Sequence, residues 1–384
     1  MADNKLTEVT TQSWFGRIGQ SIKGILFGLL LVAGAVILLF WNERRAIKRA
    51  KTLSEGAKGV ITVSADRIEP ANEGKLVHLI GMATTTETLA DPEFGVSATA
   101  LKIRRIAEMY QWKESEREST KKNLGGSSTT TKTYNYSKEW SQSLINSSQF
   151  KESEGHANPG AIVYQSRDIV AGNITVGAFT MSKSLVSRIN NFTDLSFVAL
   201  DKLPDALKEK CKLADGRLFM GGDPSSPQVG DHSVSFKVAS PTVVSLVARQ
   251  VKNSFQPYVS KVGGELELLQ VGEFSALEMF GRAKETNRLL TWGLRLGSLF
   301  VMWLGFGLIT RPLSVLADLV PLIGSIVAFG TGVLSLMMAA VVSLVTAAAA
   351  WFWYRPLLSV LMVGVAVAIV FVAHRRRRSS KLVT

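Results

Sequence analysis

Long apolar stretches near the two ends of the chain are the feature that most restricts its fold. The first, residues 24–41, reads GILFGLLLVAGAVILLFW and contains no charged residue. About 20 apolar residues in a helix cross the roughly 30 Å hydrocarbon core of a bilayer. No small-residue cleavage site follows this stretch. We therefore interpret it as a retained membrane helix rather than a removable signal peptide.

Further apolar stretches lie near the C-terminal end. We expect membrane helices at residues 289–310, 326–353 and 357–374. Residues 319–354 carry no charge, and they are too long for one perpendicular span and too short for two with a turn. We therefore assign residues 311–325, which contain Pro312 and Pro321, to a cytoplasmic linker in the membrane interface.

Lys and Arg near the span ends predict which side of the membrane each part occupies. The flanks of the long middle region count little, because large domains are translocated largely regardless of charge. Among the short connections, Arg355 alone stands against the basic tail, residues 375–384. We therefore expect both termini, residues 1–23 and 375–384, in the cytoplasm and residues 42–288 outside it.

Basic residues gather at the ends of the apolar stretches, where anionic lipid headgroups are the expected contacts. The net charge of +13 is therefore not a sign of nucleic-acid binding. The expected membrane-anchoring residues are Arg44, Arg45, Lys48, Arg49, Arg295, Arg375, Arg376, Arg377 and Arg378. Arg295 lies inside a predicted span, where its side chain either reaches the headgroups or contacts an ion or substrate.

Residues 42–288 have the pattern of a β-rich domain inserted between the first and second helices. Strand-like runs such as KLVHLIGMAT and SVSFKVAS alternate with turns rich in glycine and proline. Two polar, aromatic-rich runs, residues 101–120 and 131–144, flank the tip KKNLGGSSTT and predict a long hairpin. Ser275 and Glu278 form a capping box that predicts a helix start before the second span. A faint repeat leaves open whether the region is one domain or a duplicated pair.

The predicted fold is thus an α+β membrane protein with four transmembrane helices and a large β-rich extracytoplasmic domain. Small residues four apart allow membrane helices to approach closely, which suggests self-association. The hairpin aromatics pack one face of the strands or form an edge that a second copy joins. The candidates for self-association are Gly24, Gly28, Gly293, Gly297, Tyr110, Trp112, Tyr134, Tyr136 and Trp140.

No motif indicates catalysis, a cofactor or a metal. The four His residues are far apart, and Cys211 is the only cysteine, so no intrachain disulfide is possible. The chain contains no nucleotide-binding, zinc-protease or serine-hydrolase motif. No Asp or Glu lies inside a predicted span, which argues against an ion-coupled transporter. We therefore expect a protein that is not an enzyme and has no cofactor.

Several segments occur together in one order along the chain: NEGKLVHLIG, LADPEFGV, LKIRRIAEMYQWKE, YNYSKEW, HANPGA, VGDHSVSF, VVSLVARQ, GEFSALEMF, TWGLRL and WFWYRPL. Together they resemble the transmembrane protein 43 family, also called LUMA. The resemblance implies four spans, cytoplasmic termini and a domain in the endoplasmic reticulum lumen or perinuclear space. It also implies self-oligomerisation and the organisation of protein complexes at the inner nuclear membrane, where emerin and lamins are reported partners. The family has no agreed catalytic residues.

The sequence favours a non-enzymatic membrane scaffold that self-associates and organises membrane protein complexes or membrane patches. The alternatives are a channel or transporter component, and a β-rich domain that binds a lipid or small ligand. Expected partners are anionic lipid headgroups, further copies of the chain and other membrane proteins. Emerin- or lamin-type partners, with a location in the endoplasmic reticulum and inner nuclear membrane, are expected only of a eukaryotic member. A bacterial member would lie in the inner (plasma) membrane with a periplasmic domain.

Overall fold

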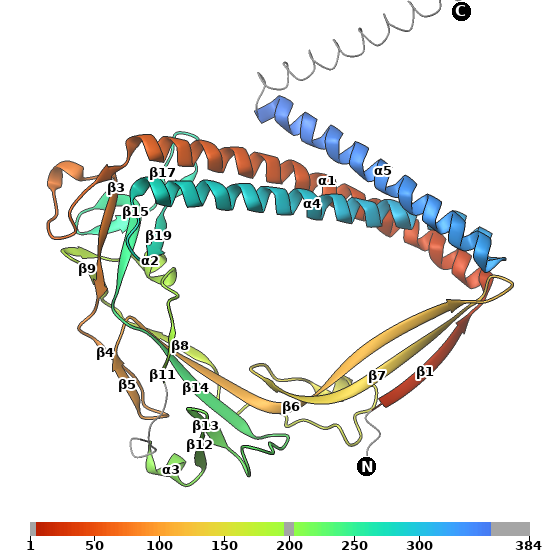
Figure 1. The fold of residues 1–384 in the computed structure, drawn as a ribbon, viewed down its shortest axis with the longest axis horizontal. Coiled ribbons are helices and arrows are strands. Elements are labelled where there is room, and N and C mark those ends of the chain that lie inside the picture. Colours follow the sequence, from red (N-terminus) through yellow and green to blue (C-terminus); the bar gives the residue numbers. More distant parts are fainter. Residues whose placement is uncertain (1–4, 196–202, 355–384) are drawn as a thin grey trace, which may run out of the picture. The chain divides into compact units, whose positions relative to one another are not determined.

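The computed structural model describes residues 5–195 and 203–354 (Figure 1). The predicted fourth helix, residues 357–374, and the four arginines Arg375–Arg378 lie outside the described residues. The chain divides into two compact units. The β-rich unit contains the residues up to Val9, Ser54–Ser119 and Thr131–Gly281. The helical unit contains Thr10–Leu53, Thr120–Thr130 and the residues from Arg282 onward.

Three helices among the described residues are long and apolar enough to cross a membrane. They are α1 (Trp14–Gly59), α4 (Ala276–Ala317) and α5 (Pro321–Tyr354). Both α1 and α4 extend well beyond the predicted spans, because the charged segments that flank the apolar residues are helical too. The capping box is confirmed: the Glu278 amide donates to Ser275 Oγ at 3.3 Å, and the Ser275 amide donates to the Glu278 carboxylate at 2.8 Å.

The predicted interfacial linker, residues 311–325, is mostly helical. Helix α4 passes through Pro312 and ends at Ala317, and α5 begins at Pro321. Proline at a first helical position loses no hydrogen bond, which explains Pro321. Pro312, which the sequence placed in the linker, lies inside α4. Membrane helices tolerate an internal proline where neighbouring groups compensate for the lost hydrogen bond.

Helices α1 and α4 run side by side in opposite directions (Figure 1). A Cβ on Gly28 would lie 2.6 Å from the carbonyl oxygen of Gly305, so the two backbones are in direct contact. The buried centre of the bundle includes residues of all three helices. They are Ala35, Leu39, Met302, Phe306 and Ala339.

The β-rich unit contains two large sheets. The first has the order β1-β7-β6-β14-β13-β12, with β8 beside β6 and β11 beside β14. Its strands are β1 (Lys5–Gln12), β6 (Lys102–Lys122), β7 (Ser128–Ser141), β8 (Arg167–Val170), β11 (Thr193–Leu195), β12 (Cys211–Ala214), β13 (Arg217–Met220) and β14 (His232–Ala239). The short helices α2 (Lys183–Ser187) and α3 (Asp205–Lys208) lie in the connections between strands.

The second sheet has the order β10-β9-β3-β15-β16, with β2 beside β3 and β19 beside β15. Its strands are β2 (Ile61–Thr62), β3 (Leu76–Thr84), β9 (Thr175–Val176), β10 (Phe179–Thr180), β15 (Thr242–Val251), β16 (Ser254–Gln256) and β19 (Leu268–Val271). Two small pairs complete the unit: β4 (Thr88–Asp91) with β5 (Val96–Thr99), and β17 (Tyr258–Val259) with β18 (Glu265–Leu266).

The two sheets share one buried core, which includes Leu79, Ile103, Phe236 and Leu246. The central pair of each sheet joins one strand from each half of the suspected repeat, since β3 pairs with β15 and β6 pairs with β14. Neither half has a core of its own in this arrangement. The β-rich part of the middle region, residues 54–119 and 131–281, therefore forms one compact unit.

The predicted hairpin is confirmed as β6 and β7. Tyr110 and Trp140 lie across it with ring centroids 5.2 Å apart. Trp112 and Tyr136 both contact His156, at centroid distances of 4.7 and 4.0 Å. Strand β1 covers the outer edge of β7, so a second copy cannot join that edge without displacing it.

Candidate functional site

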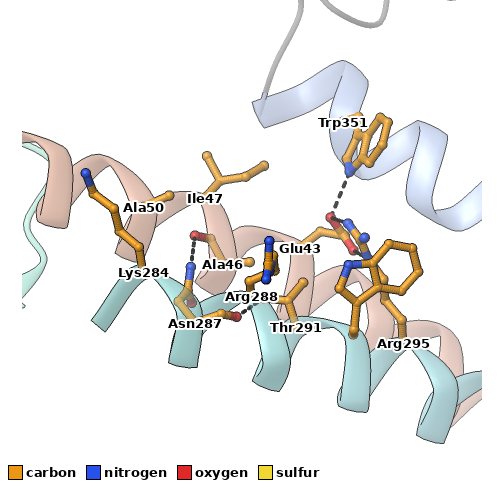
Figure 2. Close-up of a pocket in the computed structure, with 11 residues that line it drawn as sticks. Glu43, Ala46, Ile47, Ala50, Lys284, Asn287, Arg288, Thr291, Arg295 and Trp351 are labelled. Carbon is orange, nitrogen blue, oxygen red and sulfur yellow. Dashed lines mark hydrogen bonds and ion pairs between the residues drawn. The ribbon is translucent and has the colours of Figure 1, made fainter. Parts of the chain in front are cut away.

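A buried ionic cluster lies where α1, α4 and α5 meet, just beyond the apolar part of α1 (Figure 2). The Glu43 side chain is 1% exposed and accepts two hydrogen bonds from Arg295, at 2.6 and 2.9 Å. The indole N–H of Trp351 donates to the same carboxylate at 2.7 Å. A bidentate pair with a third donor satisfies the carboxylate, which a buried charge requires.

Arg295 is held against aromatic rings as well as against Glu43. Its guanidinium carbon lies 4.8 Å from the ring centroid of Trp292 and 5.7 Å from that of Trp351. The side chain is 23% exposed. Its charge is therefore neutralised inside the chain, whereas the sequence suggested contact with lipid headgroups or with an ion or substrate. The membrane-anchoring role of Arg295 stays a prediction.

A second layer of polar contacts joins α1 to α4 next to Glu43. Arg45 donates to Asn287 and Asn42, each at 3.2 Å, and to the Thr291 hydroxyl at 3.1 Å. Asn42 donates to the Thr291 carbonyl at 3.1 Å. Arg45, expected to anchor the chain in headgroups, thus also bonds α1 to α4. The neighbouring Arg44 and Lys48 are exposed, as headgroup contact requires.

A pocket of about 240 Å³ opens beside this cluster (Figure 2). The wall from α1 is small and apolar, with Ala46, Ile47 and Ala50. The lining residues from α4 are mainly polar or basic: Lys284, Asn287, Arg288, Thr291, Trp292 and Arg295. Glu43 and Trp351 complete the lining.

A different ionic cluster surrounds Asp318 in the turn between α4 and α5. The Asp318 side chain is 1% exposed and accepts hydrogen bonds from Arg17 and, at 2.7 Å, from Lys122. The Arg17 and Lys122 side chains are 10% and 32% exposed. The carboxylate also lies against Gly324, where any Cβ would collide with it. Its place just before α5 adds the favourable field of a helix N-terminus.

The hairpin tip, residues 120–130, is part of this second cluster and of the helical unit. The Gly125 amide donates to the Leu319 carbonyl at 3.1 Å, and Arg17 donates to the Gly126 carbonyl at 2.6 Å. A Cβ on Gly126 would collide with the Trp14 ring, and the φ of Gly126, +78°, is in the region that favours glycine. The tip of the predicted hairpin is therefore packed against Trp14 and hydrogen-bonded to Arg17 and Leu319.

The candidate glycines differ in what surrounds them. Gly28 contacts Gly305 of the same chain, and a Cβ added at Gly24 would lie 4.0 Å from the Leu308 side chain. A Cβ added at Gly293 or Gly297 would have no atom of the described residues within 4 Å, so these residues leave that face of α4 uncovered. The aromatic candidates belong to the hairpin described above. Among them, the Tyr134 hydroxyl donates to Glu8 at 3.5 Å.

Sequence reasoning missed Glu43 and Asp318. Glu43 follows an apolar stretch directly, and Asp318 is the single carboxylate between two apolar helices, so each position carried a signal. Among residues 5–195 and 203–354, no group of His, Cys, Asp or Glu has the arrangement of a metal site. The geometry supplies buried ion pairs and a basic pocket rather than a nucleophile and its base.

An α+β chain with a large β-rich unit and apolar helices of membrane-spanning length is an integral membrane protein. The family model "Transmembrane protein 43" matches residues 109–356. The chain is 36% identical to Transmembrane protein 43 of Homo sapiens over 377 residues, covering 95% of this chain and 93% of that protein. It is 30% identical to the Drosophila melanogaster homolog over 345 residues, covering 87% and 89%. The chain belongs to the transmembrane protein 43 family, and no solved structure matches it.

Proposed function

We propose that this protein is a non-enzymatic membrane scaffold that self-associates and organises membrane protein complexes or membrane patches. The observation that carries the proposal is the pair Gly293 and Gly297, which the described residues leave uncovered on α4. The close glycine contact between Gly28 and Gly305 is already made within the chain. Of these two pairs, the first is therefore the one open to a helix of another copy.

The surroundings of these glycines suit helix packing within a membrane. Leu289, Trp292, Leu296 and Phe300 are exposed side chains on the same part of α4. Helix association in lipid depends on close van der Waals packing, and small residues between larger ones provide it. A second α4 can therefore pack with its backbone close to Gly293 and Gly297.

The test is the mass of the full-length protein in nanodiscs, with Gly297→Leu as the variant. We expect a discrete oligomer that the variant shifts to smaller species, because the leucine separates the helices. Gly330→Leu on α5 is the matched control, since a Cβ at Gly330 would also have no atom of the described residues within 4 Å. A monomeric wild type, or equal effects of the two variants, would contradict the proposal.

Ligand binding by the β-rich unit is the second candidate function. A cavity of about 530 Å³ lies near α2 and is lined by residues including Lys102, Arg104 and Asp168. The Lys102 ammonium group is buried and donates to the Ile189 carbonyl at 2.7 Å. Burial lowers the pKa of Lys102 from its usual value, with Asp168 opposing that change. A co-purifying small molecule that is lost in Ala171→Trp would support this candidate, since Ala171 lines the cavity.

Several polar side chains of the described helices pair with one another, so they do not support the channel alternative. Arg295, the charged residue inside a predicted span, is paired with Glu43. The hydroxyls of Thr310 and Ser335 bond to each other at 3.0 Å in a buried position. Partners of emerin or lamin type and the compartment stay predictions from the family resemblance.

A further inference from the structure

We propose that the pocket beside Glu43 binds the phosphate headgroup of an anionic phospholipid. This inference goes beyond the scaffold function, because it assigns a ligand to one defined place on the chain. The pocket lies where the apolar residues of α1 and α4 give way to charged ones. Lipid phosphates occupy the same level of a bilayer.

The charge of the lining favours an anion. Among the described residues, the lining contains three cationic side chains, Lys284, Arg288 and Arg295, and one carboxylate, Glu43. Arg295 already neutralises Glu43. Lys284 and Arg288 stand four residues apart on α4, so they project from the same face of the helix. Lys284 has no ion pair with another described residue, so its charge is available to a ligand.

The charge on Arg288 is only weakly compensated. Glu285 is 3.7 Å away, and both side chains are mostly exposed, at 70% for Arg288 and 62% for Glu285. Exposed pairs at this distance contribute little and exchange readily with other partners. A phosphate between Lys284 and Arg288 would gain two charge-assisted contacts at small cost.

The shape of the pocket favours a lipid over a free anion. The α1 wall of Ala46, Ile47 and Ala50 offers no hydrogen-bond donor from its side chains. The rings of Trp292 and Trp351 lie beside Arg295. Trp351 lies at the opposite end of the pocket from Lys284 (Figure 2). A basic mouth with an apolar wall and aromatic rings matches a headgroup with the start of its acyl chains.

The experiment measures bound phospholipid by native mass spectrometry of the full-length protein from nanodiscs that contain phosphatidylserine or only phosphatidylcholine. We expect retained phosphatidylserine, with roughly thirty-fold weaker retention in Lys284→Ala/Arg288→Ala, as the loss of two cations near an anionic headgroup predicts. Lys48→Ala/Lys51→Ala is the matched control, because it removes the same charge from exposed α1 residues that do not line the pocket.

Two further arms distinguish the sources of the phosphate and the role of the cavity. Ala50→Trp fills the pocket without changing its charge, and we expect it to displace the lipid as the double variant does. Inorganic phosphate added in excess should not release the lipid. Equal losses in the pocket variant and the control would overturn the proposal in favour of a general basic surface. Release by inorganic phosphate would overturn it in favour of a soluble anion.

Discussion

Each end of the helical unit contains a buried carboxylate that basic side chains neutralise, but those side chains come from different parts of the chain. Glu43 and Asp318 are each 1% exposed and each bind a partly buried arginine. Around Glu43 the partners come from α4 and α5, and a pocket leaves Arg295 23% exposed. Around Asp318 the hairpin tip supplies Lys122, and Arg17 is only 10% exposed. The Glu43 end is open, whereas the hairpin tip closes the Asp318 end.

The difference shows that the Asp318 end depends on a segment that is distant in the sequence, whereas the Glu43 end does not. The helices bring the Glu43 partners together by their own packing, so that cluster forms with the bundle. The Asp318 cluster needs residues 120–130 to reach the turn after α4. Weakening the tip should therefore affect the Asp318 end and leave the Glu43 end intact.

The largest expected effect is that of Asp318→Asn. Removing this charge leaves Arg17 and Lys122 next to each other without a carboxylate, and breaking a buried pair costs about 3–5 kcal/mol. In Glu43→Gln, Arg295 can turn to water through the pocket, so we expect a smaller loss. Denaturant unfolding of both variants in the same detergent shows which variant loses more stability. A larger loss of stability in Glu43→Gln than in Asp318→Asn would contradict the contrast between a closed and an open end.

A smaller effect is expected from Gly126→Ala, compared with Gly125→Ala. Both glycines have positive φ, +78° and +82°, so both substitutions carry a similar backbone cost, about 1 kcal/mol. Of the two, the Cβ at Gly126 is the one that meets Trp14, because the described residues leave open space around Gly125. Hydrogen exchange at residues 120–130 should rise in Gly126→Ala beyond the rise in the control. Equal exchange in the two variants would mean that the tip is not held against Trp14.

The smallest expected effect concerns pH and the β-rich unit. Burial lowers the pKa of His232, and a backbone hydrogen bond at Gly230 and the charge of Asp231 oppose that change. The folded state thus favours neutral His232, whose stabilisation is present above the unfolded pKa of about 6.5 and is lost as pH falls toward the lower folded value. Hydrogen exchange of β14 in the full chain should therefore increase below that pH. A similar increase in His232→Gln would assign the effect to other groups.

Local signals made much of the fold predictable. The apolar stretches, the hairpin and the capping box at Ser275 depend on neighbouring residues, and the structure contains all three among its described residues. The charged flanks continue the helices beyond the predicted spans, and α4 also passes through Pro312, which the sequence placed in a linker. The positions of Glu43 and Asp318 carried a local signal, but their arginine partners are hundreds of positions away in the sequence, so no local pattern indicates which residues pair.

The Asp318 cluster also places the predicted topology under a direct test. Because one carboxylate binds both Arg17 and Lys122, we expect the start of α1 and the hairpin tip to lie on the same side of a membrane. The topology predicted from charge separates residues 1–23 from residues 42–288. That topology stays a prediction. It places residues 120–130 on the opposite side of the membrane from residues 1–23, whereas the Asp318 contacts lead us to expect both on one side.

The most direct measurement is cysteine cross-linking in native membranes, with Cys211 replaced by serine. Gly125→Cys is combined with Leu319→Cys, whose backbones are hydrogen-bonded at 3.1 Å, or with the exposed Leu289→Cys beyond the other end of the bundle as control. The closed end predicts a cross-link with position 319 and none with position 289. Failure at position 319, with the two thiols labelled from opposite sides of the membrane, would contradict the account.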